Sequence, residues 1–128
     1  DPIRVVDEDM RDWSFYQVLE HNTIVNRSMA TIVQSLARGE TPAGPGAIDP
    51  KRDVMPSADA GPEQVEAFRA SVLEHLTVAA GLGRLRGTAT WPHPVFGPFD
   101  AHRWHCMFGF HLQLHLPQAQ RVVREATR

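Results

Sequence analysis

Cysteine is nearly absent from this sequence, and other absences are equally informative. Cys106 is the only thiol among 128 residues, which excludes an internal disulfide framework and fits a reducing cytoplasm. The apolar runs are short and interrupted, so we expect no membrane span, and no signal peptide is visible. No basic block occurs and the net charge is −2, so neither nucleic acid nor a membrane surface is an expected partner. These absences predict a cytoplasmic protein.

Strongly alternating strand patterns, internal repeats and low-complexity segments are also missing. Apolar residues make up 42% of the chain and charged residues 22%, which is typical of an ordinary globular domain. A length of 128 residues suits one domain with a single core. The sequence therefore predicts one all-α domain over residues 1–128.

The first helical segment is expected within residues 12–39. Ser14 and Gln17 have the spacing of a capping box, and Gly39 is a helix stop. At about 100° per residue, one face carries His21 together with six apolar residues, namely Val18, Ile24, Val25, Met29, Ile32 and Leu36. The residues expected away from this face are Glu20, Asn26, Arg27 and Arg38.

Residues 39–62 contain five of the ten prolines and keep no helical period, which predicts a long loop or crossover. Such a loop often covers a site, and a plain surface connection is an equal alternative. Pro62 then predicts the first turn of a second helix, which ends at Gly81 and Gly83. His75 is expected at the edge of its apolar face, which comprises Val65, Phe68, Val72, Leu76 and Ala79.

A second proline-rich stretch, with Pro92, Pro94 and Pro98, forbids a continuous helix before residue 100. Asp100 can cap a third helix over residues 101–116, and Pro117 is expected to end or kink it before a last helical stretch. Three long segments are one fewer than a four-helix bundle needs. The chain begins with Asp rather than Met, so we expect a helix before residue 12 to be missing. A homodimer would cover the core that this leaves exposed.

Histidine is unusually frequent, with seven in the chain. His111 and His115 are expected one turn apart on the inward face of the third helix, with Cβ atoms roughly 6 Å apart. His21 is expected at the centre of the first helix's apolar face. His111 shares its face with Trp104, Met107, Phe108, Leu114 and Gln118, whereas the residues expected to point away are His102, His105 and Cys106.

Three imidazoles inside a bundle are costly unless their nitrogens are satisfied, and a divalent cation does this directly. The alternative is three core histidines bonded to backbone or water. Imidazole ligands suit Zn, Ni, Cu or Fe, and zinc is the default because it accepts three histidines and a water. Leu112 stands where a zincin helix has its glutamate, and no inward carboxylate is expected. Hydrolysis usually needs such a carboxylate, whereas a metal by itself favours the thiolate form of a thiol.

The segments DWSFYQVLEHN (12–22) and HRWHCMFGFHLQLHLPQ (102–118) resemble the DinB/YfiT-like family of metalloenzymes. The closer resemblance is to a subfamily with a His-Pro-x-Phe-Gly loop before a helix that carries Trp, H-x-x-x-H and Gln. The matching positions here are His93, Pro94, Phe96, Gly97, Trp104, His111, His115 and Gln118. The resemblance covers most of the chain from residue 12 onward.

This resemblance implies a DinB-like up-down four-helix bundle whose divalent ion, commonly nickel or zinc, is bound by three histidines. Carried over, the ligands are His21, His111 and His115. Some members are thiol-dependent S-transferases or isomerases that use low-molecular-weight thiols. The sequence departs from the family pattern in two ways. Relatives often have another His at the position of Leu114, and the family's first helix has no counterpart here.

We therefore expect a metal-dependent enzyme that joins a low-molecular-weight thiol, as cosubstrate, to a small-molecule acceptor. The residues expected around the acceptor are Met29, His93, Phe96, Trp104, Phe108 and Gln118, and no catalytic residue is assigned. Instead of contacting the acceptor, Trp104 could serve as a core anchor. His93 could likewise be a surface residue. Two other functions stay open, a metal-dependent hydrolase and a non-catalytic module that binds a metal or small ligand.

Overall fold

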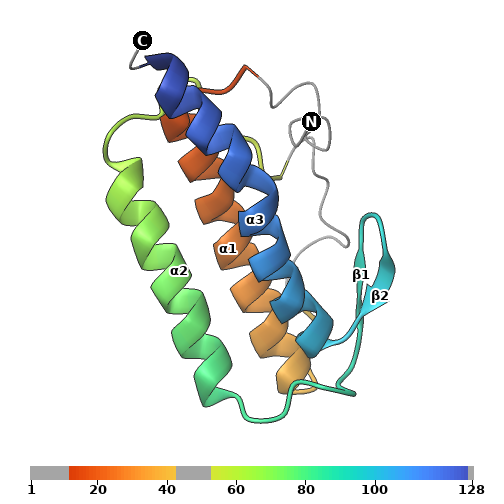
Figure 1. Ribbon diagram of the computed structural model, residues 1–128. Coiled ribbons are helices and arrows are strands. Elements are labelled where there is room, and N and C mark those ends of the chain that lie inside the picture. Colours follow the sequence, from red (N-terminus) through yellow and green to blue (C-terminus); the bar gives the residue numbers. More distant parts are fainter. Residues whose placement is uncertain (1–11, 43–52, 127–128) are drawn as a thin grey trace.

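The computed structural model describes residues 12–42 and 53–126, which form three long helices and one short hairpin (Figure 1). The elements are α1 (Phe15–Ala37), α2 (Gln64–Gly81), β1 (Trp91–His93), β2 (Gly97–Phe99) and α3 (Ala101–Ala126). The all-α prediction is confirmed. The antiparallel hairpin, which pairs Trp91 with Phe99, was not expected from the sequence. None of the described helices is long and apolar enough to cross a lipid bilayer.

The helices α1 and α2 run in the same direction, and α3 runs against both (Figure 1). A helix of 23 residues, such as α1, is about 35 Å long at 1.5 Å per residue. The chain must therefore return along the whole bundle before α2 can begin beside the start of α1. This return explains why the connection is long. Its described parts, residues 38–42 and 53–63, contain no helix or strand, as predicted, and residues 43–52 lie outside the described residues.

The predicted signals at both ends of α1 are confirmed. The Ser14 Oγ accepts from the Gln17 backbone at 3.2 Å, and the Gln17 Oε1 accepts from the Ser14 backbone at 2.9 Å, which completes the capping box. Gly39 adopts a φ of 73°, where a side chain would be strained, and the backbone N–H of Glu40 then closes the helix end on the Ser35 carbonyl.

The main core lies between α1 and α3. Met29 and Val33 of α1 are buried in one cluster with Trp104 and Phe108 of α3, and Val54 of the crossover completes it. Most of the apolar face predicted for α1 is in this cluster or packs against it. Burial of each such large side chain contributes roughly 1.5–3 kcal/mol, so this interface adds several kcal/mol to stability.

Asn26 was expected away from the core, and this prediction was wrong. The residue is fully buried, its Nδ2 donates to the Ser71 Oγ at 3.0 Å, and its backbone carbonyl accepts from the His75 Nδ1 at 3.3 Å. The reason is that α1 is the central helix, contacted by α2 on one side and by α3 on another. A helix between two partners buries more than one face.

The second helix, α2, differs from the prediction in its start and in its buried residues. The helix begins at Gln64, after Pro62 and the cap residue Glu63, rather than at Pro62 itself. Its only buried residues are polar, Ser71 and His75, whereas Leu76 of the predicted apolar face is 47% exposed. The helix therefore buries a polar strip against α1, Val72 packs against the main core beside it, and Leu76 alone of the predicted apolar face is exposed.

The last helix starts where the sequence predicted and continues further. The Asp100 Oδ1 accepts from the backbone N–H of Arg103 at 2.9 Å, which confirms the cap. Of the two outcomes expected at Pro117, an end of the helix is wrong, because α3 continues through it to Ala126. A proline inside a helix removes one backbone donor, and the buried Gln118 that follows it bonds back to His115 within the same helix.

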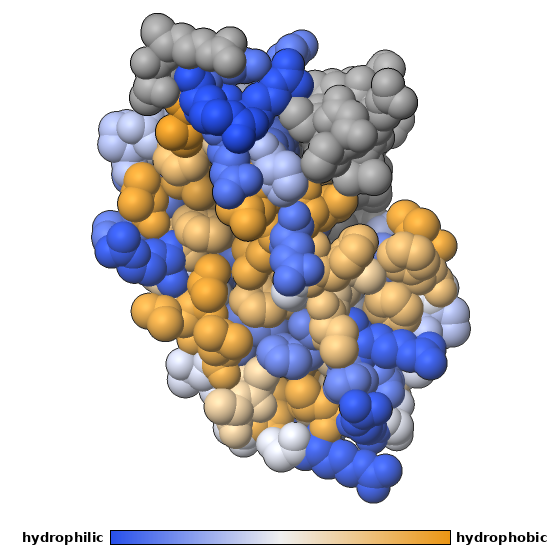
Figure 2. Space-filling model, in the orientation of Figure 1, coloured by the Kyte–Doolittle hydropathy of each residue, from blue (hydrophilic) through white to orange (hydrophobic). Residues whose placement is uncertain are grey.

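One side of the bundle stays open between the first half of α2 and the second half of α3, whereas the two helices meet further along through His75 and His105. Hydrophobic residues gather over α2 and the neighbouring part of this face (Figure 2). The groove has a volume of about 390 Å³ and is lined by Phe15, Val18, Leu19, Asn22, Phe68, Leu112, Gln113, His115, Leu116 and Ala119.

Candidate metal centre

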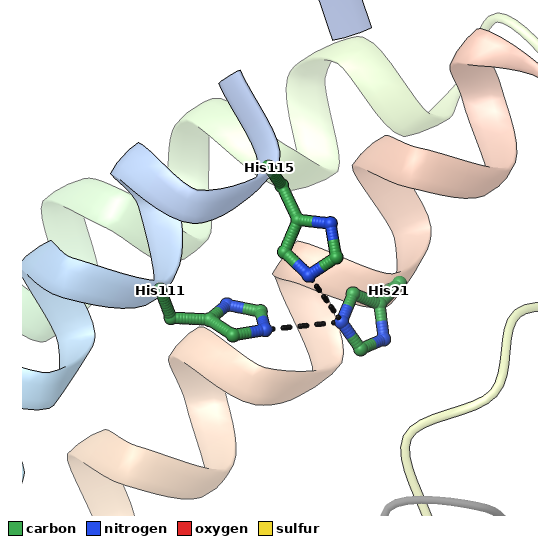
Figure 3. Close-up of side chains that lie close together, drawn as sticks. All are labelled: His21, His111 and His115. Atoms are coloured by element: carbon green, nitrogen blue, oxygen red, sulfur yellow. Dashed lines mark hydrogen bonds between the residues drawn. The ribbon is translucent and has the colours of Figure 1, made fainter. Parts of the chain in front are cut away.

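The fold brings together the three histidines that the sequence singled out. His21 comes from the second turn of α1, and His111 and His115 from α3, so that their rings face one another (Figure 3). The Nε2 of His21 lies 3.0 Å from the Nε2 of His111 and 3.2 Å from that of His115. His21 and His115 are almost completely buried, with exposures of 2% and 3%.

The protonation of His21 follows from its other neighbour. Its Nδ1 lies 2.7 Å from the backbone carbonyl of Val54. A carbonyl oxygen can only accept, so the Nδ1 carries the proton and donates it. In a neutral ring the Nε2 of His21 then has no proton, and its lone pair points at the two other histidines.

His115 is oriented in the same way. Its Nδ1 lies 2.8 Å from the Gln118 Oε1, which is also an acceptor, so the Nε2 of His115 carries a lone pair. The Nε2 lone pairs of His21 and His115 thus face each other across 3.2 Å. Two acceptors this close repel unless a proton donor or a cation lies between them.

His111 differs from the other two. Its Nδ1 is buried and finds no hydrogen-bond partner among the residues that the structure describes. Ligand histidines usually donate this second N–H to a carbonyl, a carboxylate or water. His111 is therefore the least constrained of the three rings.

All three rings are neutral near pH 7. Burial lowers the pKa of His21 to about 4, although the bond to the Val54 carbonyl opposes the shift and the His115 charge adds to it. Burial, and then the neighbouring His115, His21 and His93, lower the pKa of His111 well below its usual value. Burial also lowers the pKa of His115, against the bond to Gln118. Neutral imidazole is the form that binds a metal, so no proton has to be displaced first.

This donor set fits a divalent transition metal. Zinc–imidazole bonds of about 2.0–2.1 Å at tetrahedral angles place ligand nitrogens roughly 3.3–3.4 Å apart, a few tenths of an ångström more than the two Nε2 distances here. One ligand atom from each histidine lies within 4.8 Å of the other two, and no carboxylate or thiolate of the described chain joins the group. A cation between the rings would also remove the repulsion of the facing lone pairs.

Comparison with known protein families matches residues 4–119 to the DinB superfamily. The chain belongs to this superfamily. The match extends over all the described elements up to the second half of α3. No curated protein and no solved structure gave a significant match.

The remaining residues expected around a DinB acceptor site lie in different environments. Met29, Trp104 and Phe108 are buried in the main core, and Gln118 is the partner of His115. Phe96 is 58% exposed on the hairpin. None of them lines the groove between α2 and α3, so an acceptor site formed by these residues stays a prediction.

His93 stabilises the hairpin turn. Its Nδ1 accepts from the backbone N–H groups of Val95 at 3.0 Å and Phe96 at 3.3 Å, and its ring lies 5.3 Å from that of Trp104. The proton of the neutral ring is therefore on Nε2. His93 also lies close enough to His111 for its charge to lower the pKa of that residue.

Three residues expected to point away from the site do stay out of the cluster. Cys106 is exposed, and its Sγ lies 3.5 Å from the His102 Nε2. His105, however, does not simply face solvent, because its Nδ1 lies 3.0 Å from the Nε2 of His75. His75 was expected at the edge of the apolar face of α2, but it is buried with 1% exposure. The His75–His105 pair bridges α2 and α3, and both rings stack on Phe108.

Two neighbours of the candidate metal centre were not predicted. Val54 contributes a backbone carbonyl, which leaves no signature in the sequence. The buried ring of Trp13 lies 4.9 Å from the ring of His21. Its position just before the capping box was the one signal that placed it near the first turns of α1.

Proposed function

We propose that this protein is a metal-dependent enzyme in which His21, His111 and His115 bind one divalent ion, zinc or nickel, and that it transfers a low-molecular-weight thiol to a small electrophile. The observation that carries the metal site is the pair of facing lone pairs on His21 and His115. Membership of the DinB superfamily supports the same site.

The chemistry of the surrounding residues favours thiol activation. A bound divalent ion would lower the pKa of a thiol that coordinates it. Three neutral ligands leave the charge of such an ion undiminished, which stabilises a thiolate. The cluster of described residues contains no carboxylate to accept a proton from water, so hydrolysis has no evident general base.

The experiment is spectroscopic. The protein is loaded with Co²⁺ and titrated with a low-molecular-weight thiol near pH 7, and a sulfur-to-cobalt charge-transfer band is expected, since a soft sulfur anion competes well for a borderline-soft ion. His111→Ala is the matched control, because it should show no band. Hydrolysis of esters or amides without any response to thiols would replace the proposal by a hydrolase.

A second candidate, a non-catalytic metal-binding module, is favoured by burial. The rings of His21 and His115 are only 2% and 3% exposed, which restricts access to an ion between them. A fully loaded protein that shows no band with any thiol and no hydrolysis would establish this second function instead.

A further inference from the structure

We propose that residues 53–57 of the crossover position the metal centre. The Val54 carbonyl selects the metal-binding tautomer of His21, and Ser57 holds that carbonyl in place. The inference rests on the proposed metal site, although its first step, the choice of tautomer, exists in the metal-free protein as well.

The contact with His21 is short and buried. The distance from the Val54 oxygen to the His21 Nδ1 is 2.7 Å, and both residues are almost completely enclosed, with exposures of 5% and 2%. The Val54 side chain belongs to the main core with Val25 and Met29 of the same helix. Its methyl groups therefore anchor the backbone whose carbonyl faces the ring.

Ser57 fastens the same segment to α1 three residues later. Its Oγ donates to the carboxylate of Glu20, at 2.9 and 3.1 Å from the two oxygens, and its carbonyl accepts from the Gln17 Nε2 at 3.3 Å. Gln17 also completes the capping box with Ser14. The segment is thus bonded to the turn of α1 that leads directly into His21.

These bonds have a consequence for the ring. A neutral histidine has one proton, and either nitrogen can carry it. With the Val54 carbonyl in place the proton stays on Nδ1, and the Nε2 lone pair points at His111 and His115. If the carbonyl moves away, part of the population carries the proton on Nε2, where it blocks a metal. Docking of the segment and metal binding therefore stabilise each other.

The test uses Ser57→Ala in the full chain, measured by two methods. Nitrogen-15 NMR of the imidazoles without metal should show His21 as the Nδ1–H tautomer in the unmodified protein and as a mixture in the variant. Calorimetric titration with Zn²⁺ should show affinity about tenfold weaker, the lower end of what the loss of an orienting partner costs. Ser57→Thr keeps the hydroxyl and should restore both the Nδ1–H tautomer of His21 and the zinc affinity.

Thr31→Ala is the matched control, because it removes another exposed hydroxyl of this bundle, one that donates to the Arg27 carbonyl within α1. It should leave tautomer and affinity unchanged. Val54→Ala shortens the side chain that anchors the segment in the core. It should shift the His21 tautomer population and the zinc affinity in the same direction as Ser57→Ala. Unchanged tautomer and unchanged zinc affinity in Ser57→Ala and Val54→Ala would overturn the inference. Absence of zinc binding in the unmodified protein would instead contradict the proposed function, and the NMR result would still decide the tautomer.

Discussion

At the scale of single residues, the Nε2 of His21 contacts the Nε2 of both His111 and His115, but the three histidines differ in what holds their second nitrogen. Val54 and Gln118 orient His21 and His115, and no described residue does so for His111. Each ring nevertheless offers one of the three ligand atoms that the described residues bring together. The hydrogen-bond partner of Nδ1 affects how firmly each ring is oriented. The number of histidine ligands decides whether an ion binds tightly.

Replacing His21, His111 or His115 by Ala should therefore abolish tight metal binding. We expect each change to weaken affinity by more than about 100-fold, beyond the 10–100-fold cost of losing an outer partner. Elemental analysis of protein purified without a histidine tag, together with competitive zinc titration, measures this. Stoichiometric metal in the His111→Ala protein would contradict the three-histidine site.

The controls are His102→Ala and His105→Ala. The two variants should differ from each other in their free energy of unfolding. Neither belongs to the cluster, so both should keep full metal content. His105 also bonds to the buried His75, so its removal should lower the free energy of unfolding by about 1–3 kcal/mol. Loss of metal from either protein would place the site elsewhere.

The metal-free protein should lose stability as the pH falls from 7 to 4. The pKa of His21 is about 4 in the folded chain and 6.5 when exposed, so the unfolded chain binds more protons in this window. The stabilisation is fully present above pH 6.5 and is lost as the pH falls toward 4. His21 alone accounts for roughly 3 kcal/mol, at 1.36 kcal/mol per pKa unit.

Urea unfolding of chelator-treated protein at several pH values measures this dependence. His111 and His115 shift in the same direction, so the total slope should be steeper than that of one group. In His21→Ala the slope should be shallower. Stability that does not change between pH 7 and 4.5 would show that these rings are not buried as neutral groups.

At the scale of elements, α3 depends on its first turn because it carries two of the three ligands. The Asp100 carboxylate accepts from the backbone N–H of Arg103 and of Gly87, both at 2.9 Å, so it joins the start of α3 to the preceding loop. Asp100→Ala should lower the free energy of unfolding by about 1–2 kcal/mol. Thermal unfolding followed by circular dichroism measures the loss, and the exposed Asp59→Ala should show none.

At the scale of the whole molecule, the open side between α2 and α3 predicts self-association. The groove is apolar, and Leu116 at its lip is 54% exposed. We expect a homodimer in light scattering of this chain. Leu116→Glu should shift it toward monomer, whereas Val95→Glu, at a 74% exposed position of the hairpin, should not. A well-folded monomer at all concentrations would rule out this dimer.

The sequence by itself determined the parts of this protein that depend on near neighbours in the chain. The capping box of Ser14 and Gln17, the helix end at Gly39 and the cap at Asp100 follow from spacings of three or four residues, and all were predicted. The spacing of His111 and His115 is local in the same sense. Placing His21 beside them needed one further assumption, that apolar faces meet in the core, and α1 and α3 meet that way.

Only the tertiary structure decided what depends on how the helices are arranged. Because α1 is central and runs parallel to α2, Asn26 is buried, although a helical wheel with one buried face places it outside. Leu76 stays exposed although the other residues of its predicted apolar face are half-buried, since none of the described elements covers its position on α2. The Val54 carbonyl reaches His21 through a crossover that returns along the bundle. A backbone oxygen is the same at every residue, so only its position in space distinguishes it.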